Sequence, residues 1–146
     1  MKIVRFIDAA GTTQFGSQHD DGSVTLLEGD IYGQYSDTGQ AAQVDKLLAP
    51  IAPVDILCIG LNYKFHAEEG GMPIPEQPIL FMKSTAATQN PGDPIQIPRK
   101  LTSEEVDFEC ELAVVIGKTC KNVTKAQALD YVLGYTCGHD VSARDW

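Results

Sequence analysis

Basic residues are scarce in this sequence, and long apolar runs are absent. Against 20 Asp and Glu, the 146 residues include only 11 Lys and Arg, which gives a formal net charge of −9. A chain this acidic is a poor candidate for binding nucleic acid or an anionic membrane surface. No apolar run reaches membrane-spanning length, and the N-terminus lacks the apolar core of a signal peptide. We therefore expect a cytoplasmic protein, with a mitochondrial location as the alternative.

Paired cysteines are also lacking. The four cysteines form no C-x-x-C pair and show no zinc-finger spacing; they are Cys58, Cys110, Cys120 and Cys137. No disulfide framework is indicated, which fits a reducing compartment. Cys58 and Cys110 stand in apolar strand-like runs, where cysteine usually packs as a small hydrophobe.

Carboxylates, by contrast, are concentrated in one segment, 106–117, which ends as an apolar run and is predicted to be a core strand. Residues two apart on a strand share a face, so Asp107, Glu109 and Glu111 lie opposite Phe108 and its apolar neighbours. Like charges about 4 Å apart repel by roughly 4 kcal/mol at an effective dielectric near 20. A half-buried strand then needs a proton, a basic partner or a divalent cation, of which we favour the cation. From spacing alone, an exposed edge strand with solvated carboxylates is the alternative.

Residues 1–52 are predicted to form a small β-rich domain with a structural role. Its expected elements are strands at 2–8, 13–17 and 23–27, a polar glycine-containing stretch at 29–39 and a short amphipathic helix at 41–49. Pro50 and Pro53 follow that helix.

Residues 53–146 carry the reactive groups. Expected strands cover 55–60, 78–83, 106–117 and 133–140, and the expected helices are a turn holding His66, a helix at 124–132 and a new helix capped by Ser142. Lys83 and Asp140 each stand at the end of a strand.

Four further side chains are candidates for catalysis or anion binding. His66 and Glu69 are three apart, so on a helical turn Glu69 can orient His66 as a general base; a surface pair or a metal half-site are the alternatives. Lys83 can stabilise an oxyanion or grip a carboxylate, or simply be solvated. Arg144 can hold an anion, or pair with Asp107 or Asp145.

Several segments in order resemble the opening of a fumarylacetoacetate hydrolase family catalytic domain. They are Cys58-Ile59-Gly60-Leu61-Asn62-Tyr63, His66 with Glu69, Leu80-Phe81-Met82-Lys83, Val106 to Leu112, Gly134-Tyr135, and Asp140-Val141-Ser142-Ala143-Arg144-Asp145. Residues 1–52 resemble the small N-terminal domain of many members. The resemblance implies an α+β, mainly β fold: a mixed β-roll, of which 53–146 supply the first half.

The resemblance also implies a site and a partner. Members usually dimerise and bind Mg²⁺, Mn²⁺ or Ca²⁺ through positions that fall on Glu109, Glu111 and Asp140. Their catalytic His–Glu pair and lysine fall on His66, Glu69 and Lys83, and Tyr63 and Arg144 are the expected substrate-binding residues. A homodimer is therefore expected.

Two departures from the family pattern stand out. His139 occupies a position where members commonly have Asn, and it can add a basic group beside the site or replace Asn as a donor. Family catalytic domains also continue well beyond the motif that holds Arg144, so this chain is expected to be a fragment or a truncated homologue.

The function implied is metal-dependent hydrolysis of a carbon–carbon bond in a small anionic β-diketo acid of the fumarylacetoacetate or acylpyruvate type. Decarboxylation of oxaloacetate, another 2-oxo acid, relies on the same use of a bound metal ion as a Lewis acid. The alternatives are a family isomerase, a non-catalytic metal-binding homologue that pairs with another chain, and an inert fragment with open strand edges.

Overall fold

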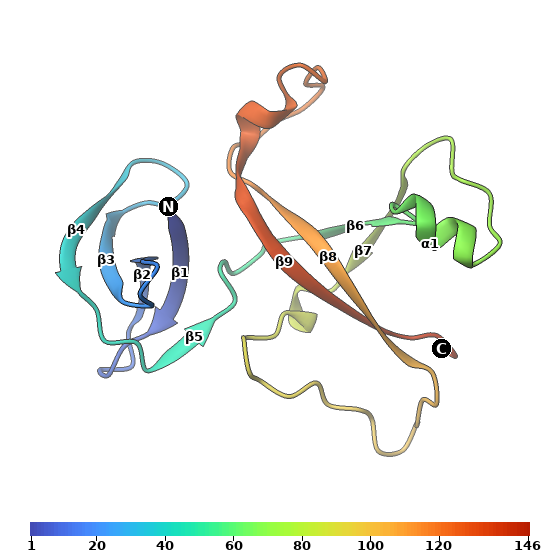
Figure 1. Ribbon diagram of the computed structural model, residues 1–146, viewed down its shortest axis with the longest axis horizontal. Helices are drawn as coiled ribbons and strands as arrows, with labels where there is room; N and C mark the ends of the chain where they lie inside the picture. Colours follow the sequence, from blue (N-terminus) through green and yellow to red (C-terminus); the bar gives the residue numbers. More distant parts are fainter.

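The computed structural model describes all 146 residues and is mainly β, as predicted. Its nine strands form a five-stranded sheet and two separate two-stranded ribbons, none of which closes into a barrel (Figure 1). The helix α1 (Lys64–Glu69) has six residues, and no helix is both long and apolar enough to cross a membrane.

The five-stranded sheet is built from the first 48 residues and is antiparallel throughout. Its strands are β1 (Lys2–Ile7), β2 (Thr13–Gln18), β3 (Val24–Gly29), β4 (Tyr35–Ala41) and β5 (Lys46–Leu48), in the order β4-β3-β2-β1-β5. Phe6 is fully buried and forms the core with Val4 and Val24. Gly16 lies over this core, where a Cβ would come within 2.4 Å of Val24 Cγ1, so the close packing requires glycine.

The three strands predicted in this region are confirmed, but the helix predicted at 41–49 is wrong. Residues 46–48 instead form β5, which pairs with β1 through Leu47 opposite Phe6 and Leu48 opposite Arg5. A nine-residue helix is marginal by itself, and here it would forfeit the burial of Leu48 at the sheet edge. The polar stretch contains β4, an exposed edge strand that lacks any apolar alternation.

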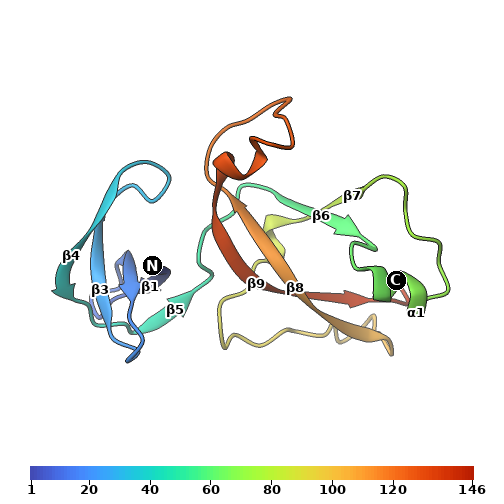
Figure 2. The same ribbon diagram turned by 45° about the horizontal axis from the view of Figure 1, so that its top comes forward.

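Two ribbons make up the rest of the chain. The strands β6 (Ile56–Gly60) and β7 (Ile79–Lys83) pair antiparallel, and so do β8 (Val106–Ile116) and β9 (Val132–Ala143). The 3-10 turns η1 (Thr85–Ala87) and η2 (Ala128–Tyr131) lie in the connections. The two ribbons cross each other, with α1 at one end of the crossing (Figures 1 and 2).

The strand predicted at 106–117 to lie in the core is only half-buried, and this corrects that prediction. On β8 the alternation is as expected, with Glu109 and Glu111 less exposed than their neighbours. The opposite face, however, is open: Phe108 is 75% exposed and Leu112 is 62% exposed. Each ribbon has only two strands, so nothing in the structure covers its outer side.

Two helix predictions near the C-terminus are also wrong. Residues 124–132 contain only the 3-10 turn η2, because this exposed tip offers no surface on which an amphipathic helix can pack. Ser142 does not cap a helix, since β9 continues to Ala143, with Ser142 opposite Asp107.

The connection between β7 and β8 ties the five-stranded sheet to the ribbons. Lys46 of β5 forms an ion pair with Asp93 at 2.7 Å, which holds the pKa of that carboxyl below its usual value. The side-chain oxygen of Asn90 accepts a hydrogen bond from the Ala49 backbone N–H at 3.0 Å. This loop therefore has one fixed end on the N-terminal sheet.

Candidate active site

Three carboxylates from two paired strands lie together on the inner face of the β8–β9 ribbon. Glu109 stands directly opposite Asp140, and Glu111 follows two residues later on the same face. One oxygen from each carboxylate lies within 4.8 Å of the others, and all three residues are half-buried. The period-two alternation of β8 and the antiparallel register thus build the predicted triad.

Burial raises the pKa of Glu111, and the negative charges of Asp140 and Glu109 raise it further. A group in this position is stabilised by a proton or by a nearby cation. The donors are all hard carboxylate oxygens, the ligands that Mg²⁺, Mn²⁺ and Ca²⁺ prefer. The triad therefore fits a divalent cation in both charge and donor chemistry.

Two basic side chains already contact the triad. The Lys83 ammonium, at the end of β7, forms an ion pair with Asp140 and lies 3.2 Å from Ser142 Oγ. The Arg144 guanidinium, just beyond β9, contacts Glu109 and also forms an ion pair with Asp107 at 3.1 Å. The pKa of Arg144 is raised by these hydrogen bonds, that to Glu109 first.

A cavity of about 420 Å³ opens beside the triad. Its polar wall holds the three carboxylates and Arg144, and α1 with the turn before it contributes Asn62, Tyr63 and His66. Its apolar wall is formed by Ile59, Met72 and Phe81. Leu61, between β6 and α1, has φ +49, a left-handed conformation that is costly for leucine and redirects the chain at the cavity edge.

The structure brings most of the predicted site residues together, with one exception. The residues that line the cavity are Glu109, Glu111, Asp140, His66, Tyr63 and Arg144. Lys83 is not part of the lining but forms an ion pair with Asp140. Glu69 does not line the cavity, and no hydrogen bond joins it to His66. The Tyr63 hydroxyl accepts a hydrogen bond from the Leu112 backbone N–H at 3.2 Å, which fixes the ring against β8.

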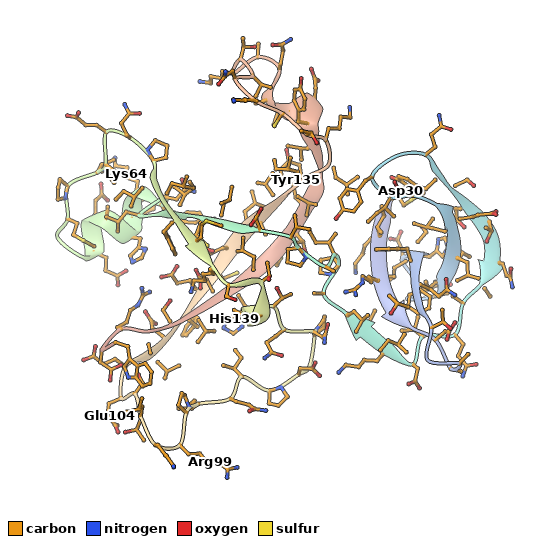
Figure 3. The ribbon with its side chains drawn as sticks, turned by 180° about the vertical axis from the view of Figure 1, so that it is seen from behind. Asp30, Lys64, Arg99, Glu104, Tyr135 and His139 are labelled. Carbon is orange, nitrogen blue, oxygen red and sulfur yellow. The ribbon has the colours of Figure 1, made fainter.

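His139 lies on the other side of the ribbon from the triad. It stands opposite Cys110 and is exposed, because neighbouring residues of a strand alternate faces (Figure 3). The structure therefore does not place a basic group beside Asp140 through His139.

Sequence reasoning gave no role in the site to three residues that lie in it or close to it. Ser142 lies two positions after Asp140, so the alternation of β9 could have placed it on the site face. Asn62 lines the cavity, and its position in the segment between β6 and α1, next to Tyr63, could have indicated this. Cys58 is the third: burial first, then the Asp140 charge, raises the pKa of its thiol, and only the crossing of the ribbons brings it close to that charge.

Two family models match the chain. One, described as fumarylacetoacetate (FAA) hydrolase, C-terminal, covers residues 55–146. The chain belongs to the fumarylacetoacetate hydrolase family. The other model, described as Rv2993c-like, N-terminal, covers residues 1–50. The resemblance seen in the sequence motifs is thereby confirmed.

Curated relatives match about two thirds of the chain. The chain is 57% identical over 101 residues to the fumarylacetoacetate hydrolase domain-containing protein 2 homolog of Dictyostelium discoideum, which covers 69% of this chain and 32% of that protein. It is 54% identical over 101 residues to Oxaloacetate tautomerase fahd2, mitochondrial, of Xenopus laevis, covering 68% of this chain and 31% of that protein. The chain thus spans about a third of the length of these relatives.

Solved structures in the family share the fold over nearly the whole chain. A 5-carboxymethyl-2-hydroxymuconate delta-isomerase from Mycobacterium smegmatis is 35% identical with a TM-score of 0.82, over 99% of this chain and 56% of that one. A fumarylacetoacetate hydrolase from Exiguobacterium antarcticum is 27% identical with a TM-score of 0.78, over 99% of this chain and 57% of that one. The chain matches little more than half of either fold.

Proposed function

We propose that this chain carries the metal centre and the catalytic base of an enzyme that cleaves a carbon–carbon bond in a small β-diketo acid. The substrate is of the fumarylacetoacetate or acylpyruvate type, and decarboxylation of oxaloacetate is the related reaction. One observation carries the proposal: three carboxylates from two strands lie together and line, with His66, one cavity of about 420 Å³. The relatives named as hydrolase, isomerase and tautomerase support an enzyme of this family.

Glu109, Glu111 and Asp140 would hold a divalent cation, Mg²⁺, Mn²⁺ or Ca²⁺, and leave positions for water or substrate. When bound, the cation supplies Lewis-acid polarisation of the substrate oxygens. Without a cation, the three carboxylates would repel an anionic substrate. A bound cation would remove this repulsion, which is consistent with a substrate that carries negative charge.

The remaining roles belong to side chains around the cavity. His66 takes a proton from water or from the substrate, and Glu69 is its proposed orienting partner, which requires a change of the Glu69 rotamer toward the imidazole. Arg144 binds the substrate carboxylate, and Tyr63 forms the wall beside it. Lys83 holds Asp140 in place and stabilises the negative charge that develops during the reaction.

A second candidate function is isomerisation or tautomerisation of a 2-oxo acid. The specific support is that two similar proteins are named for such reactions, the Mycobacterium smegmatis isomerase and the Xenopus laevis tautomerase. Such a reaction needs only one base that moves a proton between carbon atoms or between carbon and oxygen, and His66 is placed to do so. The same cavity serves both chemistries.

We also propose that residues 1–52 form a structural domain and that the chain pairs as a homodimer. The support for pairing is the apolar outer face of the ribbons, where Leu57, Leu80, Phe108 and Leu112 are each more than 60% exposed. A non-catalytic, metal-binding role through such pairing is the remaining alternative. Light scattering during size-exclusion chromatography tests the dimer.

A cytoplasmic location stays a prediction, which cell fractionation tests against a mitochondrial one.

The test is a substrate panel assayed with Mg²⁺, with Mn²⁺ and with EDTA. Loss of the enol absorbance of acetylpyruvate reports hydrolysis, carbon dioxide release from oxaloacetate reports decarboxylation, and enol decay without release reports tautomerisation. We expect cation-dependent turnover that Asp140→Asn abolishes and Glu76→Gln, an exposed loop variant, leaves intact. Turnover that persists in Asp140→Asn would contradict the proposal.

A further inference from the structure

Both basic side chains at the triad divide their bonds in the same way. Arg144 contacts Glu109, which belongs to the triad, and Asp107, which does not. Lys83 contacts Asp140 and also lies 3.2 Å from Ser142 Oγ, outside the triad. Each basic side chain therefore has a second oxygen partner, which it keeps if the triad carboxylate moves away to bind a metal ion.

Arg144 has a fixed backbone and a partly free side chain. Its backbone N–H donates to the Glu105 carbonyl at 2.9 Å. The neighbouring Asp145 accepts from Ser103 Oγ at 2.6 Å and from the Glu104 backbone N–H at 3.1 Å. The Arg144 side chain, in contrast, is 40% exposed. The position of its Cα is thus set by the loop before β8, while the guanidinium can change partners.

The present contact of Arg144 with Glu109 competes with a cation on the triad. The guanidinium nitrogen contacts the Glu109 carboxylate itself, so a divalent cation on Glu109 meets both a steric neighbour and a positive charge. Asp107 offers the alternative, because it already accepts from Arg144 Nε at 3.1 Å and is 50% exposed. Arg144 can therefore stay paired with Asp107 while it releases Glu109.

We propose that Arg144 is a displaceable counter-ion of the triad: it neutralises Glu109 until a divalent cation binds, and is then released to bind the substrate carboxylate. Since Arg144 lines the same cavity as the triad, its freed N–H groups face the space that the substrate would occupy. The cation then binds before the substrate anion, and Arg144 becomes free to bind that anion only when the metal is in place. This inference rests on the proposed function, because it requires a cation on the triad.

The first test is Mn²⁺ binding, followed by electron paramagnetic resonance of the free ion. The samples are the full chain, Arg144→Gln, and Arg99→Gln, which removes the same charge from an exposed loop distant from the triad (Figure 3). Without its competitor, the triad should bind Mn²⁺ about two- to fivefold more tightly in Arg144→Gln, the size of one partly exposed ion pair. Arg99→Gln should match the unmodified chain.

An unchanged or weaker affinity in Arg144→Gln would overturn the inference, since a residue that only orients Glu109 would be needed for metal binding. If the unmodified chain itself binds no Mn²⁺, the proposed metal centre fails, which is a distinct outcome. A second measurement uses the unmodified chain alone, without and with Mg²⁺. In the ¹⁵N-labelled chain, the Arg144 Nε–Hε signal should shift when Mg²⁺ is added. Cation binding without any change in that signal would also overturn the inference.

Discussion

Replacing Glu111 by Gln should stabilise the cation-free protein near neutral pH. The substitution keeps the shape of the side chain and removes one of three carboxylates whose oxygens lie within 4.8 Å of one another. At that separation the repulsion is roughly 3 kcal/mol per pair at an effective dielectric near 20. Lys83 and Arg144 neutralise the other two carboxylates, and water screens the half-open site. We therefore expect a net gain of about 1 kcal/mol.

The gain should depend on pH in a defined direction. The folded-state pKa of Glu111 is raised above its unfolded value, so the folded state is favoured while the carboxyl is protonated. That contribution is fully present below the unfolded pKa, near pH 4, and is lost as the pH rises through the folded value. The difference between Glu111→Gln and the unmodified chain should thus be absent at pH 4 and fully developed at pH 7.5.

The assay is thermal unfolding followed by circular dichroism, with EDTA and with saturating Mg²⁺. In EDTA at pH 7.5, Glu111→Gln should melt about 3 °C higher than the unmodified chain. At 100 times its Kd, Mg²⁺ should stabilise the unmodified chain by about 2.7 kcal/mol and the variant by much less, so the order reverses. Glu76→Gln, an exposed loop variant, should change neither value. An unchanged or lower melting temperature for Glu111→Gln in EDTA would refute the reasoning.

Three further predictions address other parts of the molecule. His66→Asn should lower kcat by about 10²- to 10⁴-fold and leave Mn²⁺ affinity unchanged, measured by steady-state kinetics and metal titration; a parallel loss of affinity would argue against a base. Phe6→Ala should destabilise the N-terminal sheet by about 3–5 kcal/mol, because the ring is fully buried; amide exchange of β1 and β2 reports this, and protection equal to that of the unmodified chain would be inconsistent with this core. Lys46→Gln should cost less than about 1 kcal/mol in urea unfolding, since its pair with Asp93 is partly exposed; a larger loss would mean that the pair does more than anchor the loop.

The triad was predictable because the period of a strand is independent of what the strand packs against. The spacing of Glu109 and Glu111 places both on one face of β8, whatever covers the other face. The position of Asp140 on the neighbouring strand came from the family motif, and the register, with Asp140 opposite Glu109, agrees with it. The pairing of Arg144 with Asp107 was one of the predicted alternatives and is confirmed.

Features that depend on tertiary packing were not predictable. Leu47 and Leu48 suit a helix face equally well, and only their pairing with β1 decides for a strand. The apolar runs around Phe108 and Leu80 predict buried strands, yet exposure depends on how many strands flank them. The contact of Lys83 with Asp140 joins the two ribbons, so it required their crossing. The contact of Arg144 with Glu109 required the pairing of β8 with β9.

Mn²⁺ binding to the unmodified chain and to Glu109→Ala tests the central claim most directly. The account predicts that the unmodified chain binds one Mn²⁺ per chain. Removal of one of the three carboxylate ligands should lower the Mn²⁺ affinity by at least about tenfold. Glu76→Ala serves as the control, because it removes an exposed carboxylate outside the site. Equal Mn²⁺ affinity in all three proteins, or no binding by the unmodified chain, would contradict the assignment of Glu109, Glu111 and Asp140 as a metal centre.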